Sequence, residues 1–348
     1  MGKFFSKFSR YRDIGIDLGT ANTLVFVRER GIVANEPSVV AVNTRNGNIV
    51  AVGDEAKRMV GKTPAHITAT RPLVNGIISD FEVTEKMLRY FIEKALGGSR
   101  SFLVRPRVVV GIPLQVTEVE RKAVEDALLS AGASEVYLIE QPLAAALGAR
   151  LPIEDSVGTL VIDIGGGTTD IAVIALGGIV TSRSLQVAGD ELNRNIVQYA
   201  RDHFNLALGE RNAELVKIRI GTAAPPDEPL EMAIRGRDII SGLPKEVLVS
   251  DAKIREAMQR SVRIIIEGVK ATLEATPAEL VSDIYERGMV LTGGGGLLKG
   301  LDKLLSESTG VHVRIAEDPL TCVVRGTGLL LDNTELLKEA AVPSARAN

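Results

Sequence analysis

The feature that most constrains the fold is a strand–turn–strand pattern that occurs twice in the chain. The first copy covers residues 14–27 and places Asp17 at the end of an apolar strand, directly before a turn rich in glycine and threonine. The second copy covers residues 160–173 and places Asp163 at the same point, before a run of three glycines. A single hairpin of this kind is an ordinary turn. Two copies indicate a duplicated core, with one hairpin in each of two domains.

The rest of the sequence alternates between strand and helix patterns. Apolar runs predict strands at 108–112, 136–139 and 289–291. Helical spacing predicts helices over 83–96, 117–130 (opened by a capping box of Thr117 and Glu120), 144–149, 192–208 and 250–273, and from about 297. Strands that alternate with helices are typical of a layered α/β architecture. A length of 348 residues predicts about two domains.

Two stretches have the character of insertions into this core. Residues about 33–74 contain a polar hairpin and one short helix, and residues about 189–246 contain two helices and a proline-rich loop. One insertion in each half fits two domains that each bear a smaller subdomain. The expected organisation is a tail over 1–12, a domain I over 13–150 that is completed by about 316–340, and a domain II over 151–315.

Composition limits the chemistry that the chain can perform. Its 41 basic and 44 acidic residues leave a net charge of −3, so we expect no nucleic-acid partner bound by bulk charge. Cys322 is the single cysteine and there are three histidines, which argues against disulfides and against cysteine- or histidine-based metal sites. Glycine, with 34 residues, is over-represented. We therefore expect chemistry that depends on glycine turns and carboxylates.

The two glycine turns are candidate phosphate sites. A turn without side chains exposes several backbone N–H groups, and successive N–H groups bind anions. Two such turns that face each other across a cleft could bind a polyphosphate from both sides. Asp17 and Asp163, each at the strand end that enters its turn, would hold a hydrated Mg²⁺, because magnesium prefers a few carboxylates plus waters.

Three further stretches have both a functional and a structural interpretation. Four glycines at 293–296 follow a strand and would let the backbone lie against a purine or ribose, or they form a tight strand-to-helix turn. Glu214 and Lys217 share one helical face, where a simple ion pair is the alternative to a ligand contact. Glu140 and Gln141 end a strand, where polar groups face the ligand crevice of an α/β sheet or simply cap a turn.

These motifs carry a resemblance to a known superfamily. The segments 16–23, 163–170 and 291–296 resemble the two phosphate motifs and the adenosine motif of the actin-like ATPases. The segments 31–41, 71–76, 80–81 and 316–320 are similar to the MreB/Mbl family of bacterial actins within it. The resemblance extends from about residue 14 to about residue 332.

The resemblance implies an α/β protein with the actin-like ATPase fold. This fold has two ribonuclease-H-like domains around a nucleotide cleft, each with a small inserted subdomain. By matching motif, the residues that would contact the phosphates of ATP are Thr20, Ala21, Asn22, Gly166, Gly167 and Thr168. Those that would frame the ribose and base are Glu214, Leu215, Val216, Lys217, Gly294, Gly295, Gly296 and Leu297.

The resemblance also implies a function. Members of this family are ATP- and Mg²⁺-dependent proteins that polymerise into filaments at the inner face of the cytoplasmic membrane, where they direct wall synthesis and rod shape. The implied partners are copies of the chain itself, membrane lipid, and cell-wall elongation proteins such as MreC, MreD and RodZ. A small-molecule kinase of the same superfamily is the alternative, with Asp170 as its base, but the insertions look too small to form an acceptor site. A chaperone would need a peptide-binding domain after the ATPase.

One departure from the family pattern concerns hydrolysis. The family usually has glutamate directly before the proline, as the group that orients the attacking water, and this chain has Gln141 there. Glutamine cannot accept a proton, but phosphoryl transfer depends mainly on positioning and charge neutralisation. We therefore expect slow hydrolysis with Gln141 and Thr168 in catalytic roles. Glu140, one residue earlier on the opposite side of the strand, is the rival candidate.

The amino-terminal tail has the pattern of a membrane-surface helix. At helical spacing, Phe4, Phe5 and Phe8 fall on one face, while Lys3 and Lys7 lie opposite them. Rings buried in lipid and basic residues on anionic headgroups both favour binding. A single tail would bind weakly and a filament of many tails strongly, by avidity. The alternative is a disordered start to the chain.

Overall fold

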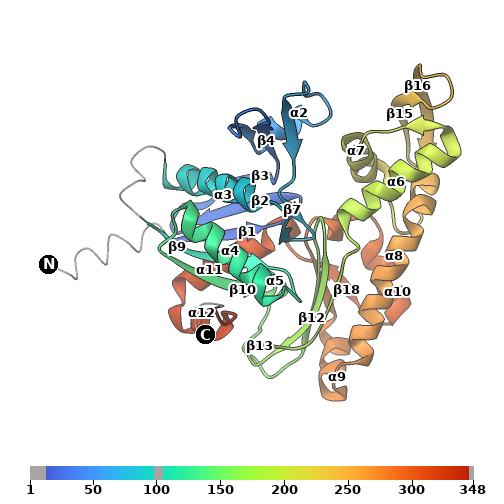
Figure 1. The fold of residues 1–348 in the computed structure, drawn as a ribbon. Helices are drawn as coiled ribbons and strands as arrows, with labels where there is room; N and C mark the ends of the chain where they lie inside the picture. Colours follow the sequence, from blue (N-terminus) through green and yellow to red (C-terminus); the bar gives the residue numbers. More distant parts are fainter. Residues whose placement is uncertain (1–12, 98–104, 345–348) are drawn as a thin grey trace. The chain divides into compact units, whose positions relative to one another are not determined.

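The computed structural model describes residues 13–97 and 105–344, and the chain divides into two compact units (Figure 1). Unit 1 contains the described residues of Met1–Val157, Ile174–Val180 and Leu320–Asn348. Unit 2 consists of Gly158–Val173 and Thr181–Pro319. The predicted tail helix, including Phe4, Phe5 and Phe8, lies outside the described residues.

Unit 1 is built on a five-stranded sheet of order β10-β9-β1-β2-β3. β1 pairs antiparallel with β2 and parallel with β9, and β9 pairs parallel with β10. The five strands are β1 (Ile14–Leu18), β2 (Asn22–Val27), β3 (Gly31–Pro37), β9 (Arg107–Ile112) and β10 (Glu135–Glu140). The first predicted hairpin is thus β1–β2, at the centre of this sheet.

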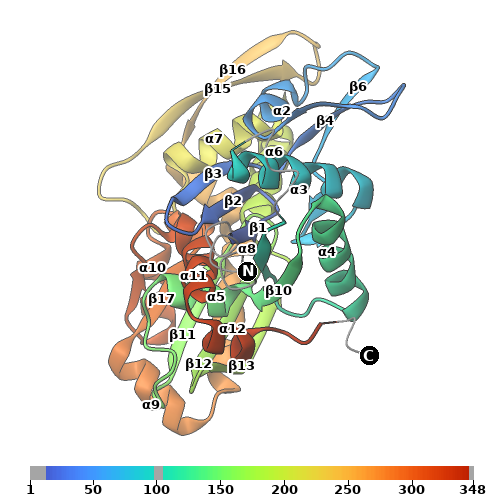
Figure 2. The same cartoon turned by 90° about the vertical axis from the view of Figure 1, so that its left-hand side faces the viewer.

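Two helices cover one face of this sheet, α3 (Phe81–Leu96) and α4 (Glu118–Ala131) (Figures 1 and 2). Their buried residues pack with the alternate residues of β1 that point to the same face: the shared core includes Ile14, Ile16, Leu18, Met87, Leu88, Phe91, Val124 and Leu128. The predicted capping box of Thr117 and Glu120 is present at the start of α4.

The other face carries α5 (Gln141–Gly148) and α11 (Cys322–Asp332), which cross very closely. A Cβ on Gly326 would lie 1.8 Å from the backbone oxygen of Ala144, and one on Gly148 would lie 1.8 Å from that of Cys322. The expected helix start at residue 144 was wrong. α5 begins at Gln141, because Pro142 fits the first turn of a helix, where its missing N–H is not needed.

The insertion of unit 1 forms a small sheet of order β5-β4-β6 with one helix (Figure 2). Its elements are β4 (Val40–Asn43), β5 (Ile49–Val52), α2 (Asp54–Met59) and β6 (Ile67–Thr70). The predicted hairpin and helix are present, while β6 was not predicted. A two-stranded hairpin, β7 (Leu73–Val74) and β8 (Ile77–Ile78), follows the insertion and leads into α3.

The sheet of unit 2 has the order β13-β12-β11-β17-β18, with β17 parallel to both β11 and β18. The second predicted hairpin is β11–β12, and the tip of the β12–β13 hairpin groups with unit 1. The strands are β11 (Thr159–Ile164), β12 (Thr169–Ala175), β13 (Gly178–Leu185), β17 (Met289–Thr292) and β18 (Val313–Ile315).

The insertion of unit 2 differs from the expected structure in two places. The predicted helix over 192–208 is α6 (Gly189–Phe204), which ends because Asn205 adopts a left-handed conformation (φ 49°), and the next residues form β14 (Leu206–Ala207). A long hairpin, β15 (Glu231–Asp238) and β16 (Pro244–Ser250), was missed. β15 lies beside α7 (Glu210–Ile220) (Figure 1).

The remaining helices of unit 2 pack around its sheet. α8 (Asp251–Glu274) follows Ser250 as predicted, although the Ser250 side chain makes no capping hydrogen bond. Gly268 of α8 lies against Leu185 and Ile171 of the sheet. The helix expected from residue 297 is instead the short 3₁₀ turn η3 (Gly295–Leu297), and α10 (Leu301–Thr309) starts after Gly300.

Three further helices complete the described chain: α9 (Ala278–Arg287), the 3₁₀ turn η4 (Pro319–Thr321) and α12 (Thr334–Ala340). Within residues 13–97 and 105–344, no helix combines the length and the apolar character that crossing a bilayer requires.

Candidate functional site

The first glycine turn, in unit 1, has its carbonyl groups fixed by hydrogen bonds. Asp17 lies near the end of β1, and the hydroxyl of Ser38 donates to the Gly19 carbonyl at 2.6 Å while the Ser38 N–H donates to the Ala21 carbonyl at 3.0 Å. All described peptide bonds are trans, so the N–H of the following residue points away from each bound carbonyl. The N–H groups of Thr20 and Asn22 are therefore directed away from Ser38, as an anion site requires.

The side chain of Thr20 is bound on the same turn. Its Oγ1 accepts a hydrogen bond from the Gly76 N–H at 2.7 Å. Asn75 and Gly76 form the tight turn of the β7–β8 hairpin, with φ values of 51° and 74°. A Cβ on Gly76 would lie 2.3 Å from Pro113 Cγ, so only glycine fits between Thr20 and Pro113.

Gln141 and Glu140 lie at the junction of β10 and α5. The Gln141 side-chain amide donates to Asp17 Oδ1 at 3.2 Å, and the Gln141 side chain is buried against Gly111. Burial raises the pKa of Glu140, and the neighbouring Arg121 guanidinium opposes this shift. The structure thus brings Gln141 together with Asp17 and places Glu140 near Arg121. We refer to Asp17, residues 20–22 and Gln141 as the unit-1 half-site.

The second aspartate, Asp163, lies near the end of β11 and pairs in register with Thr292 of β17. The Thr292 hydroxyl donates to Asp163 Oδ1 at 3.0 Å. Burial raises the pKa of Asp163 to about 6, and the hydrogen bond from Thr292 opposes this shift. A buried carboxylate that is expensive to ionise alone is stabilised by a cation beside it.

The second glycine turn is fixed in the same way as the first. The carbonyl of Gly165 accepts the Gly189 N–H at 3.1 Å, and that of Gly166 accepts the Asp190 N–H at 2.8 Å. These donors lie at the start of α6. The N–H groups of Gly166 and Gly167 consequently point away from α6, because their peptides are trans.

The predicted ribose and base residues of unit 2 lie on α7 and on the glycine run. The Lys217 ammonium donates to the Gly189 carbonyl at 2.8 Å and so ties α7 to the start of α6. Leu215 and Leu297 are partly exposed, at 38% and 48%, whereas Val216 is buried in the apolar core of unit 2. The side chain of Val216 therefore packs in that core.

The glycine run lies directly against the end of β11. A Cβ on Gly293 would lie 2.4 Å from the backbone oxygen of Ile164 and 2.6 Å from Asp163 Oδ1, and one on Gly295 would lie 2.2 Å from Ile164 Cγ2. Only glycine allows this approach. We refer to Asp163, residues 165–168 and residues 293–296 as the unit-2 half-site.

The donor set fits magnesium. Among the described residues, no group of three or more His, Cys, Asp or Glu side chains could hold a metal ion. Mg²⁺ does not require such a cage, because it retains several waters and binds one or two carboxylates together with phosphate oxygens. Asp17 in unit 1 and Asp163 in unit 2 each offer one carboxylate of this kind before a glycine turn.

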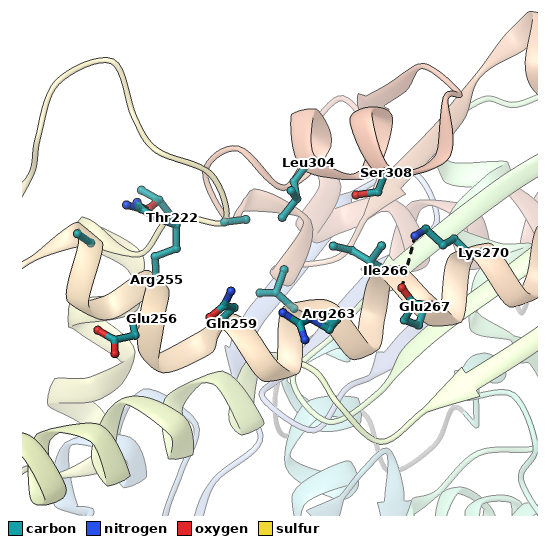
Figure 3. Close-up of a pocket in the computed structure, with 13 residues that line it drawn as sticks. Thr222, Arg255, Glu256, Gln259, Arg263, Ile266, Glu267, Lys270, Leu304 and Ser308 are labelled. Carbon is teal, nitrogen blue, oxygen red and sulfur yellow. Dashed lines mark hydrogen bonds and ion pairs between the residues drawn. The ribbon is translucent and has the colours of Figure 1, made fainter.

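A groove in unit 2 lies outside both half-sites (Figure 3). It has a volume of about 500 Å³ between α8 and α10. Its ends carry the Arg255–Thr222 hydrogen bond, at 2.8 Å, and the Lys270–Glu267 pair, at 3.4 Å. None of the predicted site residues lines it.

Comparison with known proteins decides the family. The family model described as MreB/Mbl protein matches residues 11–339. The chain belongs to the MreB/Mbl family. Among relatives, it is 49% identical to the cell shape-determining protein Mbl of Bacillus subtilis over 326 residues, which cover 94% of this chain and 97% of Mbl. It is also 49% identical to the cell shape-determining protein MreB of Escherichia coli over 339 residues, 96% of either chain.

Solved structures confirm the expected actin-like fold for this MreB/Mbl member. MreB5 of Spiroplasma citri bound to ADP superimposes with a TM-score of 0.89 at 39% identity, covering 95% of this chain and 98% of that one. The same protein bound to AMPPNP gives 0.89 at 40% identity, covering 94% and 97%. The MamK double helical filament has a TM-score of 0.77 at 23% identity, covering 92% and 98%, and supports the fold alone.

Sequence reasoning about this MreB/Mbl chain missed the residues that hold the half-sites. Ser38, Gly76 and Thr292 were part of quoted segments, yet no role was assigned to them. Gly189 was seen only as the start of an insertion. Spacing along the chain carries no signal for these contacts, because each joins residues far apart in sequence.

Proposed function

We propose that this chain binds ATP with Mg²⁺ and hydrolyses it slowly. The observation that carries the proposal is shared by both units. In each, an aspartate near the end of a central strand precedes a glycine turn whose carbonyls are hydrogen-bonded to protein, at 2.6 and 3.0 Å in unit 1 and 3.1 and 2.8 Å in unit 2. The opposed N–H groups can therefore bind phosphate oxygens. The Spiroplasma citri relative solved with ADP and with AMPPNP supports this assignment.

The side chains have distinct roles in this proposal. Asp17 and Asp163 are the carboxylates that would hold magnesium, and a bound magnesium ion would neutralise phosphate charge. Gln141 orients the attacking water through its side-chain amide. Thr168, at the end of the second glycine turn, is the other residue with a catalytic role. Glu214, Leu215 and Lys217 of α7, with residues 294–297, would lie beside the ribose and base, while the buried side chain of Val216 supports α7 from the core. Lys217 also fixes the start of α6.

We further propose that ATP binding drives assembly of the chain into filaments of itself. Relatives are named cell shape-determining proteins, and we propose the same role for this chain. An assembling protein needs exposed apolar surface. The turn of the β15–β16 hairpin supplies some, since Ile240 is 80% and Leu243 is 65% exposed. Asp238 fixes this turn by accepting the N–H groups of Ile240 and Ser241.

The proposed site of action is the inner face of the cytoplasmic membrane, with the basic, phenylalanine-containing tail as anchor. There the filament would direct wall synthesis and rod shape together with elongation proteins such as MreC, MreD and RodZ. A small-molecule kinase is not favoured. Its candidate base, Asp170, is 1% exposed and accepts a hydrogen bond from Thr168, so it does not face an acceptor site.

Light scattering and sedimentation with Mg-ATP test the assembly proposal. We expect scattering above a critical concentration with Mg-ATP and none after magnesium is chelated. Exchanging both Ile240 and Leu243 for serine should raise the critical concentration while circular dichroism and ADP binding stay unchanged. A chain that binds ATP but never assembles at any concentration would contradict filament formation. A chain that binds no nucleotide would contradict the ATP assignment itself.

A further inference from the structure

Each inserted subdomain begins at the residue that anchors a glycine turn. In unit 2 the insertion starts at Gly189, whose N–H donates to the Gly165 carbonyl at 3.1 Å, with Asp190 donating to Gly166 at 2.8 Å. In unit 1 the corresponding residue is Ser38, which lies between β3 and β4, where the chain leaves the large sheet for the small one. In both units, the carbonyl groups of the glycine turn are therefore hydrogen-bonded by the residues at which the insertion begins.

Ser38 makes two hydrogen bonds to the turn that together set its orientation. Its hydroxyl donates to the Gly19 carbonyl at 2.6 Å, and its N–H donates to the Ala21 carbonyl at 3.0 Å. With both carbonyls held toward Ser38, the N–H groups of Thr20 and Asn22 are turned to the opposite side. Loss of the hydroxyl would free the peptide between Gly19 and Thr20 to rotate.

The direction of the Ser38 hydroxyl is fixed by a second buried hydroxyl. Ser38 Oγ and Thr23 Oγ1 are 2.8 Å apart, and both residues are 0% exposed. A serine hydroxyl has one hydrogen, and that hydrogen goes to the Gly19 carbonyl. Thr23 must then be the donor to Ser38. The result is a directed chain from Thr23 through Ser38 to Gly19, with no water needed to complete it.

Ser38 also connects the turn to the inserted subdomain. Its neighbour Val39 accepts the N–H of Gly53 at 2.9 Å, and Gly53 is the N-cap residue of α2. In the β7–β8 hairpin that follows the insertion, the Gly76 N–H donates to Thr20 Oγ1 at 2.7 Å. The turn is thus bonded to the chain at the entry of residues 39–70 and again shortly after their end. These hydrogen bonds give the turn a direct physical connection to the insertion.

We propose that Ser38 is a positioning residue that orients the N–H groups of Thr20 and Asn22 toward phosphate and couples nucleotide binding to the subdomain of residues 39–70. This inference rests on the proposed nucleotide function. Phosphate bound at those N–H groups fixes the conformation of the turn. The fixed turn keeps its two hydrogen bonds with Ser38, and Ser38 in turn restrains β4, the strand that starts the insertion. The ligand that the site recognises is a nucleoside polyphosphate.

The first test measures ADP affinity by calorimetry, with Mg²⁺ present. Ser38→Ala should weaken ADP binding about tenfold, because one buried hydrogen bond that sets the site is lost. Ser261→Ala is the matched control: Ser261 is a buried serine of unit 2 whose hydroxyl bonds Asn195 at 2.6 Å, and its loss should leave affinity within about twofold. Thr23→Val, which removes only the donor to Ser38, should weaken binding about threefold.

The second test measures hydrogen exchange with and without ADP in the wild-type chain and in Ser38→Ala. In the wild type, ADP should slow exchange at both glycine turns and also in residues 39–53. In Ser38→Ala, saturating ADP should still protect residues 165–168 but no longer residues 39–53. A structural role alone would lower stability without removing this ligand-dependent protection.

The outcomes separate the inference from the proposed function. If the wild type binds no ADP, the nucleotide function is wrong. If it binds ADP, and Ser38→Ala behaves like Ser261→Ala in both tests, the positioning role of Ser38 is wrong. Should Ser38→Ala fail to fold, wild-type exchange decides. Protection of residues 165–168 without any protection of residues 39–53 would overturn the coupling.

Discussion

The side-chain amide of Gln141 donates a hydrogen bond to the carboxylate of Asp17 at 3.2 Å. Gln141 is the first residue of α5, and Asp17 lies near the end of β1, so the contact joins the start of a helix to the central strand of unit 1. One of the two N–H donors of the amide nitrogen is used by this bond, while the carbonyl oxygen of the same amide is an acceptor suited to a water molecule. This arrangement leads to a prediction about hydrolysis.

Gln141→Ala should slow phosphate release about 10²-fold, equivalent to about 2.7 kcal/mol of activation free energy, with ADP affinity nearly unchanged. The reason is that an oriented water is lost while the phosphate-binding N–H groups remain. Filaments should still form, since assembly needs bound ATP rather than hydrolysis. A phosphate-release assay under single-turnover conditions gives the rate, and calorimetry gives the affinity.

Two companion variants distinguish Gln141 from Glu140. Glu140→Gln should be nearly silent, because Glu140 lies near Arg121 rather than on Asp17. Gln141→Glu should retain or raise the rate at pH 8. Its rate should fall more steeply at low pH than that of the wild type, because the new carboxyl group lies beside that of Asp17 and two adjacent carboxyl groups resist ionising together. A damaging Glu140→Gln with a silent Gln141→Ala would reverse the assignment.

The raised pKa of Asp163, about 6, predicts a pH dependence of nucleotide binding. Below this pH the buried carboxyl keeps its proton, and magnesium must displace it. Mg-ADP affinity should therefore rise as the pH increases from 5 to 7. Thr292→Val removes the hydrogen bond that favours the carboxylate, so the midpoint of the rise in Mg-ADP affinity should move to higher pH.

Asp163→Ala should abolish Mg-nucleotide binding in a chain that still folds.

The same pKa has a consequence for stability without ligand. An acid whose folded pKa lies above its ordinary value of 3.8 favours the folded state while protonated. This contribution is complete below pH 3.8 and is lost as the pH rises through about 6. Relative to the wild type, Asp163→Asn should be more stable at pH 8 than at pH 5. Equal differences in unfolding free energy at both values would show that Asp163 ionises normally.

The crossing of α5 and α11 in unit 1 depends on Gly326. A Cβ there would lie 1.8 Å from the Ala144 carbonyl, which is backbone and cannot move aside cheaply. Gly326→Ala should destabilise the chain by about 3 kcal/mol or more. Gly178→Ala is the control, since nothing lies within 4 Å of its added Cβ, and its effect should stay within about 0.5 kcal/mol. Urea unfolding of both variants measures the difference.

Deleting residues 2–11 should leave polymerisation intact and remove liposome binding. The prediction comes from the segregation of Phe4, Phe5 and Phe8 from the basic residues of the tail. Co-sedimentation of Mg-ATP filaments with anionic vesicles measures it, with neutral vesicles as the comparison. Truncated filaments that still sediment fully with anionic vesicles would show that another surface is the main anchor.

The sequence alone determined the elements that depend on local pattern. Alternation and capping within a few residues predict the duplicated Asp–glycine hairpins, the capping box at Thr117 and the strands β9 and β10. All of these elements are present. The fold class followed from the motif resemblance, and the comparisons confirmed it. Errors came where one residue changed the local conformation, as at Asn205, whose left-handed backbone ends α6.

Only the tertiary structure decided how the glycine turns are held. The contacts of Ser38 with Gly19, of Gly189 with Gly165 and of Thr292 with Asp163 join residues 19 or more positions apart. Such contacts depend on strand order and on which helix starts beside which turn, and no local spacing encodes either. An N–H group becomes available to phosphate when the carbonyl of its peptide is bound elsewhere, and that partner is set by the packed fold.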